Sequence, residues 1–255
     1  MKTHLVIPAR FKSTRLPAKP LLNIHGKPMI VWTAERAATA VADGVADDYY
    51  VATEDERIFE LCQARAIPVV MTSQAHESGT DRLSEVAHIL NFGAEDIVIN
   101  LQGDEPLVPS ALLLQVKQLL LGKPQCDMAT LCEPIASYEQ FCSPSVVKVV
   151  LANQEALYFS RSPIAYNRAN PLDFTCAYRH LGLYAYRVRL LTAFATWQMG
   201  VLERLESLEQ LRVLENGKKI AIDIATLSLP VGVDTQEDLD RLNAMSLSEL
   251  QRHFL

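Results

Sequence analysis

The chain has 255 residues, of which 49% are hydrophobic and 21% charged, and these fractions exclude disordered and fibrous proteins. The net charge of −6 argues against a nucleic-acid-binding surface, and no stretch has the roughly 18 uninterrupted apolar residues that a membrane helix needs. The opening apolar run is too short for a signal peptide, and the five cysteines form no CxxC pair. We therefore expect a cytoplasmic protein that binds neither membrane nor nucleic acid.

The first half of the chain alternates predicted strands with predicted helices. Short apolar runs rich in β-branched residues predict strands at residues 5–7, where Pro8 ends the run, and at 49–52, 69–71 and 97–101. Apolar residues spaced three or four positions apart predict helices from Met29, around Ile58, around Leu83 and at residues 111–121. This alternation continues through residue 135 and predicts a mostly parallel sheet with helices on both faces.

The second half of the chain breaks this rhythm. Residues 146–151, 156–160 and 181–186 are strand-like, and no long helix separates them. We therefore expect a smaller antiparallel lobe, at approximately 136–200, inserted before the fold closes. A helix at 202–214, a strand at 220–224 and a helix at 235–242, capped by Asp234 or Thr235, complete the expected elements. No linker or repeat divides the chain, so we expect a single Rossmann-like α/β domain over residues 1–255.

Positive charge is concentrated at the start of the chain. Residues 1–34 contain six lysines and arginines and no acidic residue, so the remaining chain carries −12. Arg10, Arg15 and Lys19 follow the first predicted strand, at the edge where open α/β sheets bind ligands. Arginine forks and a lysine point charge suit a polyphosphate. The segment therefore predicts an anion site, with a basic, proline-rich surface loop as the alternative.

Carboxylates follow two predicted strands. Asp104 and Glu105 come after the buried strand at 97–101, and Asp234 lies between a strand and the last predicted helix. Mg²⁺ prefers one or two carboxylates together with phosphate oxygens. These positions predict a magnesium site beside the basic segment, although Asp234 taken alone could be an ordinary helix cap. The signature motifs of P-loop NTPases, dinucleotide-binding folds, zincins and common hydrolases are absent from the sequence.

Eight segments, in order along nearly the whole chain, together resemble the CMP-Kdo synthetase (3-deoxy-manno-octulosonate cytidylyltransferase) family. They are HLVIPARFKSTRLPAKPLLNIHGKPMI, HESGTDRLSEV, VINLQGDEPL, VVKVVL, ALYFSRSPI, YRHLGLYAYR, LESLEQLRVLENG and GVDTQEDLDR. The resemblance implies a nucleotidyltransferase α/β fold with a dimerisation lobe, and therefore a homodimer.

The resemblance also implies a reaction and the residues that serve it. The anomeric hydroxyl of Kdo, an acidic eight-carbon keto sugar, attacks the α-phosphorus of CTP and gives a CMP-sugar and pyrophosphate for lipopolysaccharide synthesis. The implied catalytic residues are Lys19, Asp104 and Asp234, and the last two also bind Mg²⁺. The implied nucleotide-binding residues are Pro8, Ala9, Arg10, Arg15, Lys19, Ser78, Gly79 and Thr80. The implied sugar-binding residues are Gln102, His180, Tyr184, Glu209 and Gln210. His180 could act as a base, although a hydrogen-bonding role is the more frequent one in a sugar site.

Two positions depart from the family pattern. Ser73 and Ala75 stand where relatives usually have an arginine and an aspartate. They adjoin the substrate-facing segment, so a Kdo derivative altered at a distal carbon, such as 8-amino-Kdo, is an alternative acceptor. Two further alternatives are a sialic-acid-like acceptor, which QGDEP and YRHLGLYAYR disfavour, and a non-catalytic nucleotide-sugar-binding protein. The last would predict the loss of a loop cation or a carboxylate, and all are present.

Overall fold

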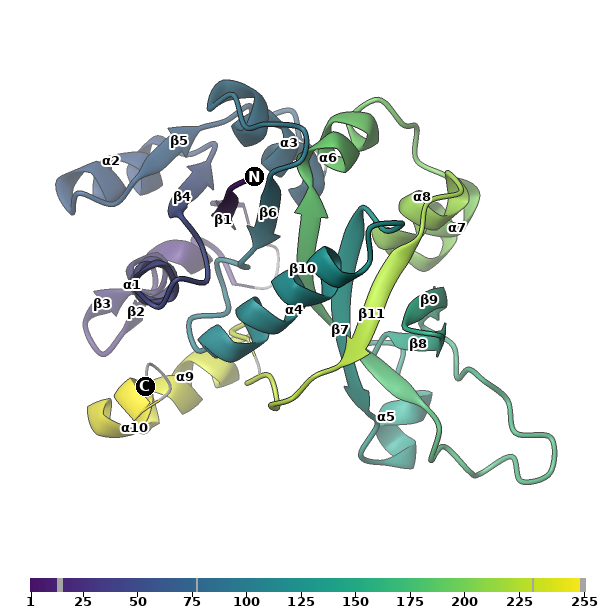
Figure 1. Ribbon diagram of the computed structural model, residues 1–255. Coiled ribbons are helices and arrows are strands. Elements are labelled where there is room, and N and C mark those ends of the chain that lie inside the picture. Colours follow the sequence, from purple (N-terminus) through teal and green to yellow (C-terminus); the bar gives the residue numbers. More distant parts are fainter. Residues whose placement is uncertain (13–15, 77, 231, 253–255) are drawn as a thin grey trace.

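The computed structural model describes residues 1–12, 16–76, 78–230 and 232–252. In this part of the chain, nine strands form one mixed sheet, in the order β5-β4-β1-β6-β10-β7-β11-β9-β8 (Figure 1). The expected α/β class is confirmed. The sheet is mixed and not mostly parallel, because the strands of the second half of the chain add antiparallel pairs.

The parallel part of the sheet is buried on both faces at its centre, in β1 and β6, and partly exposed toward its edge, in β4 and β5. It contains β5 (Val69–Met71), β4 (Asp48–Thr53), β1 (Thr3–Ala9) and β6 (Ile97–Asn100). Burial on both faces explains why β1 and β6 appear in the sequence as continuous apolar runs. The prediction that Pro8 ends the first strand is wrong: β1 continues to Ala9, because Pro8 and Ala9 still pair with β4 beyond the pairing with β6.

Helices cover both faces of these strands. Leu5 and Ile7 of β1 pack in one cluster with α1 (Met29–Ala42), α2 (Glu56–Ala64) and α4 (Ser110–Gly122). Val6 points to the opposite face, toward α3 (Gly79–Ile89) and α6 (Val188–Phe194). This alternation follows the two-residue period of a strand. The predicted helices of the first half all form, near their expected positions.

The antiparallel part of the sheet begins in its middle. β10 (Tyr178–Arg187) lies between β6 and β7 (Met128–Pro134) and is antiparallel to both. β11 (Ile220–Ile224) runs parallel to β7, and the hairpin β8 (Lys148–Ala152) and β9 (Glu155–Ser160) completes the sheet. The start of β10 also pairs with β8. Near α5 (Tyr138–Cys142), residues 161–177 extend away from the body of the molecule as a long loop (Figure 1).

The expected single helix at 202–214 is wrong. Two short helices form instead, α7 (Val201–Glu206) and α8 (Gln210–Glu215), because Ser207 adopts a left-handed conformation with φ of 51°. Ser207, Leu208 and Glu209, which form the turn between these helices, line a cavity.

The last helix has the expected cap. Thr235 caps α9 (Gln236–Ala244) and forms a capping box with Asp238. α9 and a further helix, α10 (Leu247–Arg252), pack against α1 and the small hairpin β2 (Asn23–Ile24) and β3 (Lys27–Pro28). In the described part of the chain, no helix has the length and hydrophobicity that crossing a bilayer requires.

Candidate active site

The segments that carry the predicted site meet at the carboxyl ends of β1 and β6. The turn after β6 packs directly on the end of β1: a Cβ atom on Gly103 would lie 2.8 Å from the Pro8 carbonyl oxygen. Only glycine allows this approach. The same turn binds the C-terminal segment, because the Val233 N–H donates to the Asp104 carbonyl oxygen at 2.9 Å. These contacts bring residues 8, 104 and 234 together from three distant parts of the chain.

Lys19 lies between the two predicted metal-binding carboxylates. It begins the short 3₁₀ helix η1 (Lys19–Leu21), and its Nζ donates to Asp104 Oδ2 at 2.5 Å and to Asp234 Oδ1 at 3.0 Å. Burial alone would lower the pKa of this ammonium, but Asp104 and Asp234 together raise it above its ordinary value. The structure therefore places three residues, predicted from separate motifs, in one charged cluster.

A cavity of about 670 Å³ extends from this cluster. The predicted nucleotide-binding residues that line it are Pro8, Ala9, Arg10, Lys19, Ser78, Gly79 and Thr80. The predicted sugar-binding residues that line it are Gln102, Tyr184, Glu209 and Gln210. Arg15, predicted on the triphosphate segment, lies outside the described residues. The two predicted halves thus share one cavity, which Lys19 and Asp104 also line.

His180 is not among the described residues that line the cavity. Its Nε2 lies 2.9 Å from Thr130 Oγ1, and its ring packs 4.9 Å from the Phe159 ring and 5.2 Å from the Tyr184 ring, between centroids. Burial lowers the pKa of this imidazole to about 3, so the ring is neutral near pH 7. A base this weak is poorly suited to accept a proton from a sugar hydroxyl. In this structure His180 contacts the ring of Tyr184, which lines the cavity, and does not line the cavity itself.

Several cavity residues were not singled out in the sequence. Tyr186 and Asn100 line the cavity, as do Lys12, Glu203 and Arg212. Tyr186 is buried, and the pKa of its hydroxyl is raised by that burial, although hydrogen bonds with Thr80 and Asn100 oppose the shift. A signal for Tyr186 existed in the sequence: it is two positions from Tyr184, so the two rings share one face of a strand.

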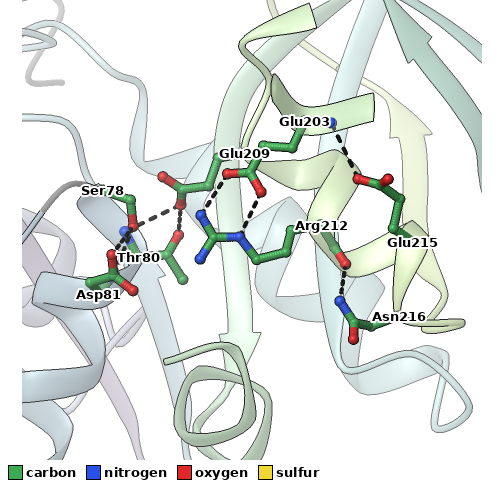
Figure 2. Close-up of polar contacts among 8 residues, drawn as sticks. All are labelled: Ser78, Thr80, Asp81, Glu203, Glu209, Arg212, Glu215 and Asn216. Atoms are coloured by element: carbon green, nitrogen blue, oxygen red, sulfur yellow. Dashed lines mark hydrogen bonds and ion pairs between the residues drawn. The ribbon is translucent and has the colours of Figure 1, made fainter. Parts of the chain in front are cut away.

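Glu209 connects the two halves of the cavity (Figure 2). Its carboxylate accepts hydrogen bonds from the Thr80 backbone N–H, at 3.2 Å, and from the Thr80 hydroxyl, at the start of α3. Burial, assisted by the negative charge of Asp81, raises the pKa of Glu209 to about 7, while the Thr80 hydrogen bond and Arg212 lower it. A predicted sugar-binding residue therefore contacts a predicted nucleotide-binding residue directly.

The donor set at the Lys19 cluster suits a hard divalent cation. Within the described ranges, no three His, Cys, Asp or Glu side chains converge as metal ligands. Asp104 and Asp234 do converge on one positive charge, that of Lys19. Mg²⁺ is usually held by one or two carboxylates and substrate phosphates, so the residues present fit it provided that the nucleotide supplies the remaining oxygens.

Comparison with known proteins agrees with this geometry. The sequence profile of a cytidylyltransferase family matches residues 4–220. The 3-deoxy-manno-octulosonate cytidylyltransferase of Psychrobacter sp. (strain PRwf-1) is 59% identical, covering 98% of this chain and 96% of that protein. The enzyme of the same name from Acinetobacter baumannii (strain SDF) is 57% identical, covering 97% of this chain and 99% of that protein.

Solved structures are similar along the same length. A CMP:2-keto-3-deoxy-manno-octonic acid synthetase complexed with CTP has a TM-score of 0.87 and 41% identity, covering 96% of this chain and 98% of that one. A cytidylyltransferase from Leptospira borgpetersenii, at 18% identity and a TM-score of 0.63, shares the fold and covers 99% of this chain and 93% of that one. With a matching profile, close full-length relatives and the predicted residues gathered in one cavity, this chain belongs to the 3-deoxy-manno-octulosonate cytidylyltransferase family.

Proposed function

We propose that the protein transfers CMP from CTP to the anomeric hydroxyl of Kdo and releases pyrophosphate, supplying an activated sugar for lipopolysaccharide synthesis. The observation that carries the proposal is the cluster of Lys19, Asp104 and Asp234 at the edge of a cavity lined both by cationic residues and by polar residues that include tyrosines. The full-length relatives named for this activity support it.

The cationic residues of the cavity suit the triphosphate. Arg10, Lys12 and Lys19 border the cavity beside the ends of β1 and β6. A guanidinium can grip two phosphate oxygens, while an ammonium acts as a point charge. Phosphoryl transfer requires little covalent chemistry from the protein, so the work of these residues is to hold the α-phosphate in line with the nucleophile and to spread its charge.

We propose that Asp104 and Asp234 hold Mg²⁺ together with phosphate oxygens of the nucleotide. When bound, the ion would neutralise phosphate charge and lower the pKa of the attacking hydroxyl. Lys19 already binds both carboxylates, so it is placed to keep them oriented and to contribute its own positive charge beside the phosphates. This arrangement requires no side-chain base, which agrees with the neutral, partly buried His180.

Other residues that line the cavity suit a polar, acidic sugar. Gln102, Tyr184, Glu209 and Gln210 present an amide, a phenol, a carboxyl and an amide to the same cavity. A site built from such groups rejects acceptors that leave them without hydrogen bonds. We propose that these residues bind the acceptor, and that His180 acts on it only through the Tyr184 ring.

The proposed acceptor is unmodified Kdo. The two departures from the family pattern, Ser73 and Ala75, are not among the described residues that line the main cavity. Ala75 borders an adjacent hollow instead, and both residues are exposed. The structure therefore adds no support for 8-amino-Kdo, which stays a prediction from the sequence.

The test is pyrophosphate release from CTP with Kdo, 8-amino-Kdo and a sialic acid in parallel. We expect kcat/KM to be highest for Kdo. A preference for 8-amino-Kdo of about tenfold or more, or about 1.4 kcal/mol, would instead support the altered acceptor. Binding of CTP without pyrophosphate release from any acceptor would contradict the enzymatic proposal and favour a non-catalytic nucleotide-binding protein.

We also propose that two copies of the chain form a homodimer through the β8–β9 hairpin and the loop that follows it. Leu157, Tyr166 and Leu172 are 58%, 73% and 67% exposed there. Large apolar side chains that stay exposed on a hairpin and on the loop that follows it are typical of a surface that another protein covers. The resemblance to a dimeric family supports a second copy of this chain as that cover.

A further inference from the structure

A buried ion pair joins two short helices beside Glu209 and Gln210, two of the proposed acceptor-binding residues. The Arg212 guanidinium donates from Nε and Nη2 to the two carboxylate oxygens of Glu203, at 2.6 Å each (Figure 2). The side chains of Arg212 and Glu203 are only 8% and 6% exposed. Two parallel charge-assisted bonds fix the guanidinium in one orientation. The pair connects α8 to α7, and both of its residues border the cavity.

A second contact ties the same helices together. Glu215, the last residue of α8, accepts hydrogen bonds from the backbone N–H groups of Leu202 at 2.9 Å and Glu203 at 3.2 Å. These donors have no intrahelical partner at the start of α7, and Gly200 supplies no side-chain cap. A Cβ atom on Gly200 would overlap the Glu215 carboxylate, so glycine at this position leaves room for the contact.

The turn between the helices depends on such contacts. Each helix has six residues, far fewer than the roughly 12–15 that an isolated helix needs in water. Ser207 in the turn has a φ of 51°, a conformation that is unfavourable for a residue with a side chain. Local propensity therefore does not determine the turn, and side-chain contacts must hold it. The Arg161 guanidinium donates to the carbonyl oxygens of Glu206, at 2.6 Å, and Ser207, at 3.3 Å, while Arg212 and Glu215 fix the two helices on either side. This turn brings Glu209 and Gln210 to the cavity.

Arg212 also acts on the cavity wall directly. Its guanidinium carbon lies 4.2 Å from the centre of the Phe194 ring, and Phe194 lines the cavity. Its positive charge opposes the burial that raises the pKa of Glu209. One side chain thus connects α7, the Phe194 ring and the charge of Glu209.

We propose that Arg212, held by Glu203, is a positioning residue that fixes the α7–α8 turn and so places Glu209 and Gln210 against the acceptor sugar. The inference rests on the proposed function, because it takes this wall of the cavity to be the sugar-binding one. A pair that only stabilises the fold would leave both KM values unchanged in the folded enzyme. A positioning pair instead affects the acceptor and spares the nucleotide.

The main test is steady-state kinetics of the double variant Glu203→Met/Arg212→Met. Removing both charges avoids the unpaired buried carboxylate that Arg212→Met alone would leave. We expect the KM for Kdo to rise about tenfold or more, while the KM for CTP stays within about threefold of wild type. Arg212→Lys keeps the charge but loses the fork, so its KM for Kdo should lie between those of the wild type and the double variant.

A matched control removes another buried arginine, one that is not among the described residues that line the cavity. Arg36 on α1 is 2% exposed, and its Nη2 donates to Ser110 Oγ at 2.9 Å. Arg36→Met should lower the thermal unfolding temperature without changing either KM. Gly200→Ala is an independent variant: it displaces the Glu215 carboxylate, retains the buried pair and should also raise the KM for Kdo selectively.

Each result decides the inference. The inference is wrong if the KM for Kdo stays within about threefold of wild type in the folded double variant and in Gly200→Ala. It is also wrong if the KM for Kdo and the KM for CTP rise equally, because that result would indicate general loosening of the cavity. If circular dichroism shows that the double variant does not fold, Gly200→Ala and Arg212→Lys decide together. If the wild type releases no pyrophosphate with Kdo, the proposed function fails, and this arm separates that failure from failure of the inference.

Discussion

Replacing Lys19 by methionine removes the positive charge that two carboxylates share. Methionine retains a long unbranched side chain, so the change deletes the ammonium with little loss of packing. The deleted contacts are those to Asp104 at 2.5 Å and to Asp234 at 3.0 Å. Without the ammonium, the two carboxylates and the nucleotide phosphates have one cation fewer between them.

The magnitude follows from exposure and charge. A hydrogen bond to a charged group contributes roughly 1.5–3 kcal/mol, and solvent screening lowers this value. The side chains of Lys19, Asp104 and Asp234 are 14%, 28% and 42% exposed, so we expect the two contacts together to contribute about 2–3 kcal/mol of folding free energy, at the low end of the range. Loss of one preorganised donor to the charge of a transition state costs about 10²–10³ in kcat.

The direction in which the pKa of Lys19 is shifted means that its contribution can be measured at neutral pH. Because the pKa of Lys19 is raised above its ordinary value of 10.5 in the folded protein, its stabilising contribution is present at neutral pH. It is lost only as the pH rises through the higher folded-state pKa. Measurements near pH 7.5 therefore compare a fully charged lysine with an uncharged side chain.

The assay is pyrophosphate release from CTP at saturating Kdo, with urea unfolding of the same preparations. We expect Lys19→Met to lower kcat/KM by about 10²–10³ and Lys19→Arg, which keeps the charge, to retain more activity than Lys19→Met. An activity of Lys19→Met within about threefold of wild type would refute the assigned role. Equal activities of the two variants would show that the charge itself is unimportant.

Three further predictions concern the metal, Glu209 and the assembly. Asp104→Asn and Asp234→Asn should each remove most turnover by lowering Mg²⁺ affinity, and isothermal titration of Mg²⁺ with CTP present should show weaker binding, whereas wild-type affinity in both would contradict the metal assignment. The folded-state pKa of Glu209, about 7 against an ordinary 4.5, means that the ligand-free protein loses stability as the pH rises between these values. In urea unfolding, the free energy of unfolding of Glu209→Gln should fall less between pH 4.5 and pH 8 than that of the wild type, and the two falls should differ by at most about 3 kcal/mol. Identical pH profiles would contradict the raised pKa of Glu209. Light scattering at micromolar concentration should give the mass of a dimer, and Leu157→Asp with Tyr166→Asp should shift it to a monomer; a monomeric wild type would contradict the proposed interface.

Local pattern alone determined much of this fold. The strands at 69–71, 97–101 and 220–224 and the helix beginning at Met29 form where the sequence predicts them. Their signals are short apolar runs and a 3.6-residue period, and both depend on which side chains a single element buries. The sequence also predicted that Lys19, Asp104 and Asp234 would meet, because segments that follow parallel strands lie at one edge of a sheet.

Tertiary structure decided what depends on partners far away in the sequence. The position of β10 between β6 and β7 depends on hydrogen bonds between residues 178–187 and two distant strands, and no local pattern specifies such pairing. This position of β10 brings Tyr184 and Tyr186 into the lining of the cavity. His180, on the same strand, packs against the Tyr184 ring outside the lining, and burial there lowers the pKa of its imidazole.

The α7–α8 turn shows the same dependence on long-range contacts. Its residues have continuous helical periodicity, so the sequence predicts one helix across Ser207. The two helices are joined by Glu203, Arg212 and Glu215, which are charged side chains that commonly lie exposed on a helix surface. Only packing against α6 and the sheet excludes water from Glu203 and Arg212 and converts these two residues into a buried pair, while Glu215 stays exposed. The sequence determines which side chains can bind nucleotide and metal, and the fold determines which of the remaining polar residues are buried beside them.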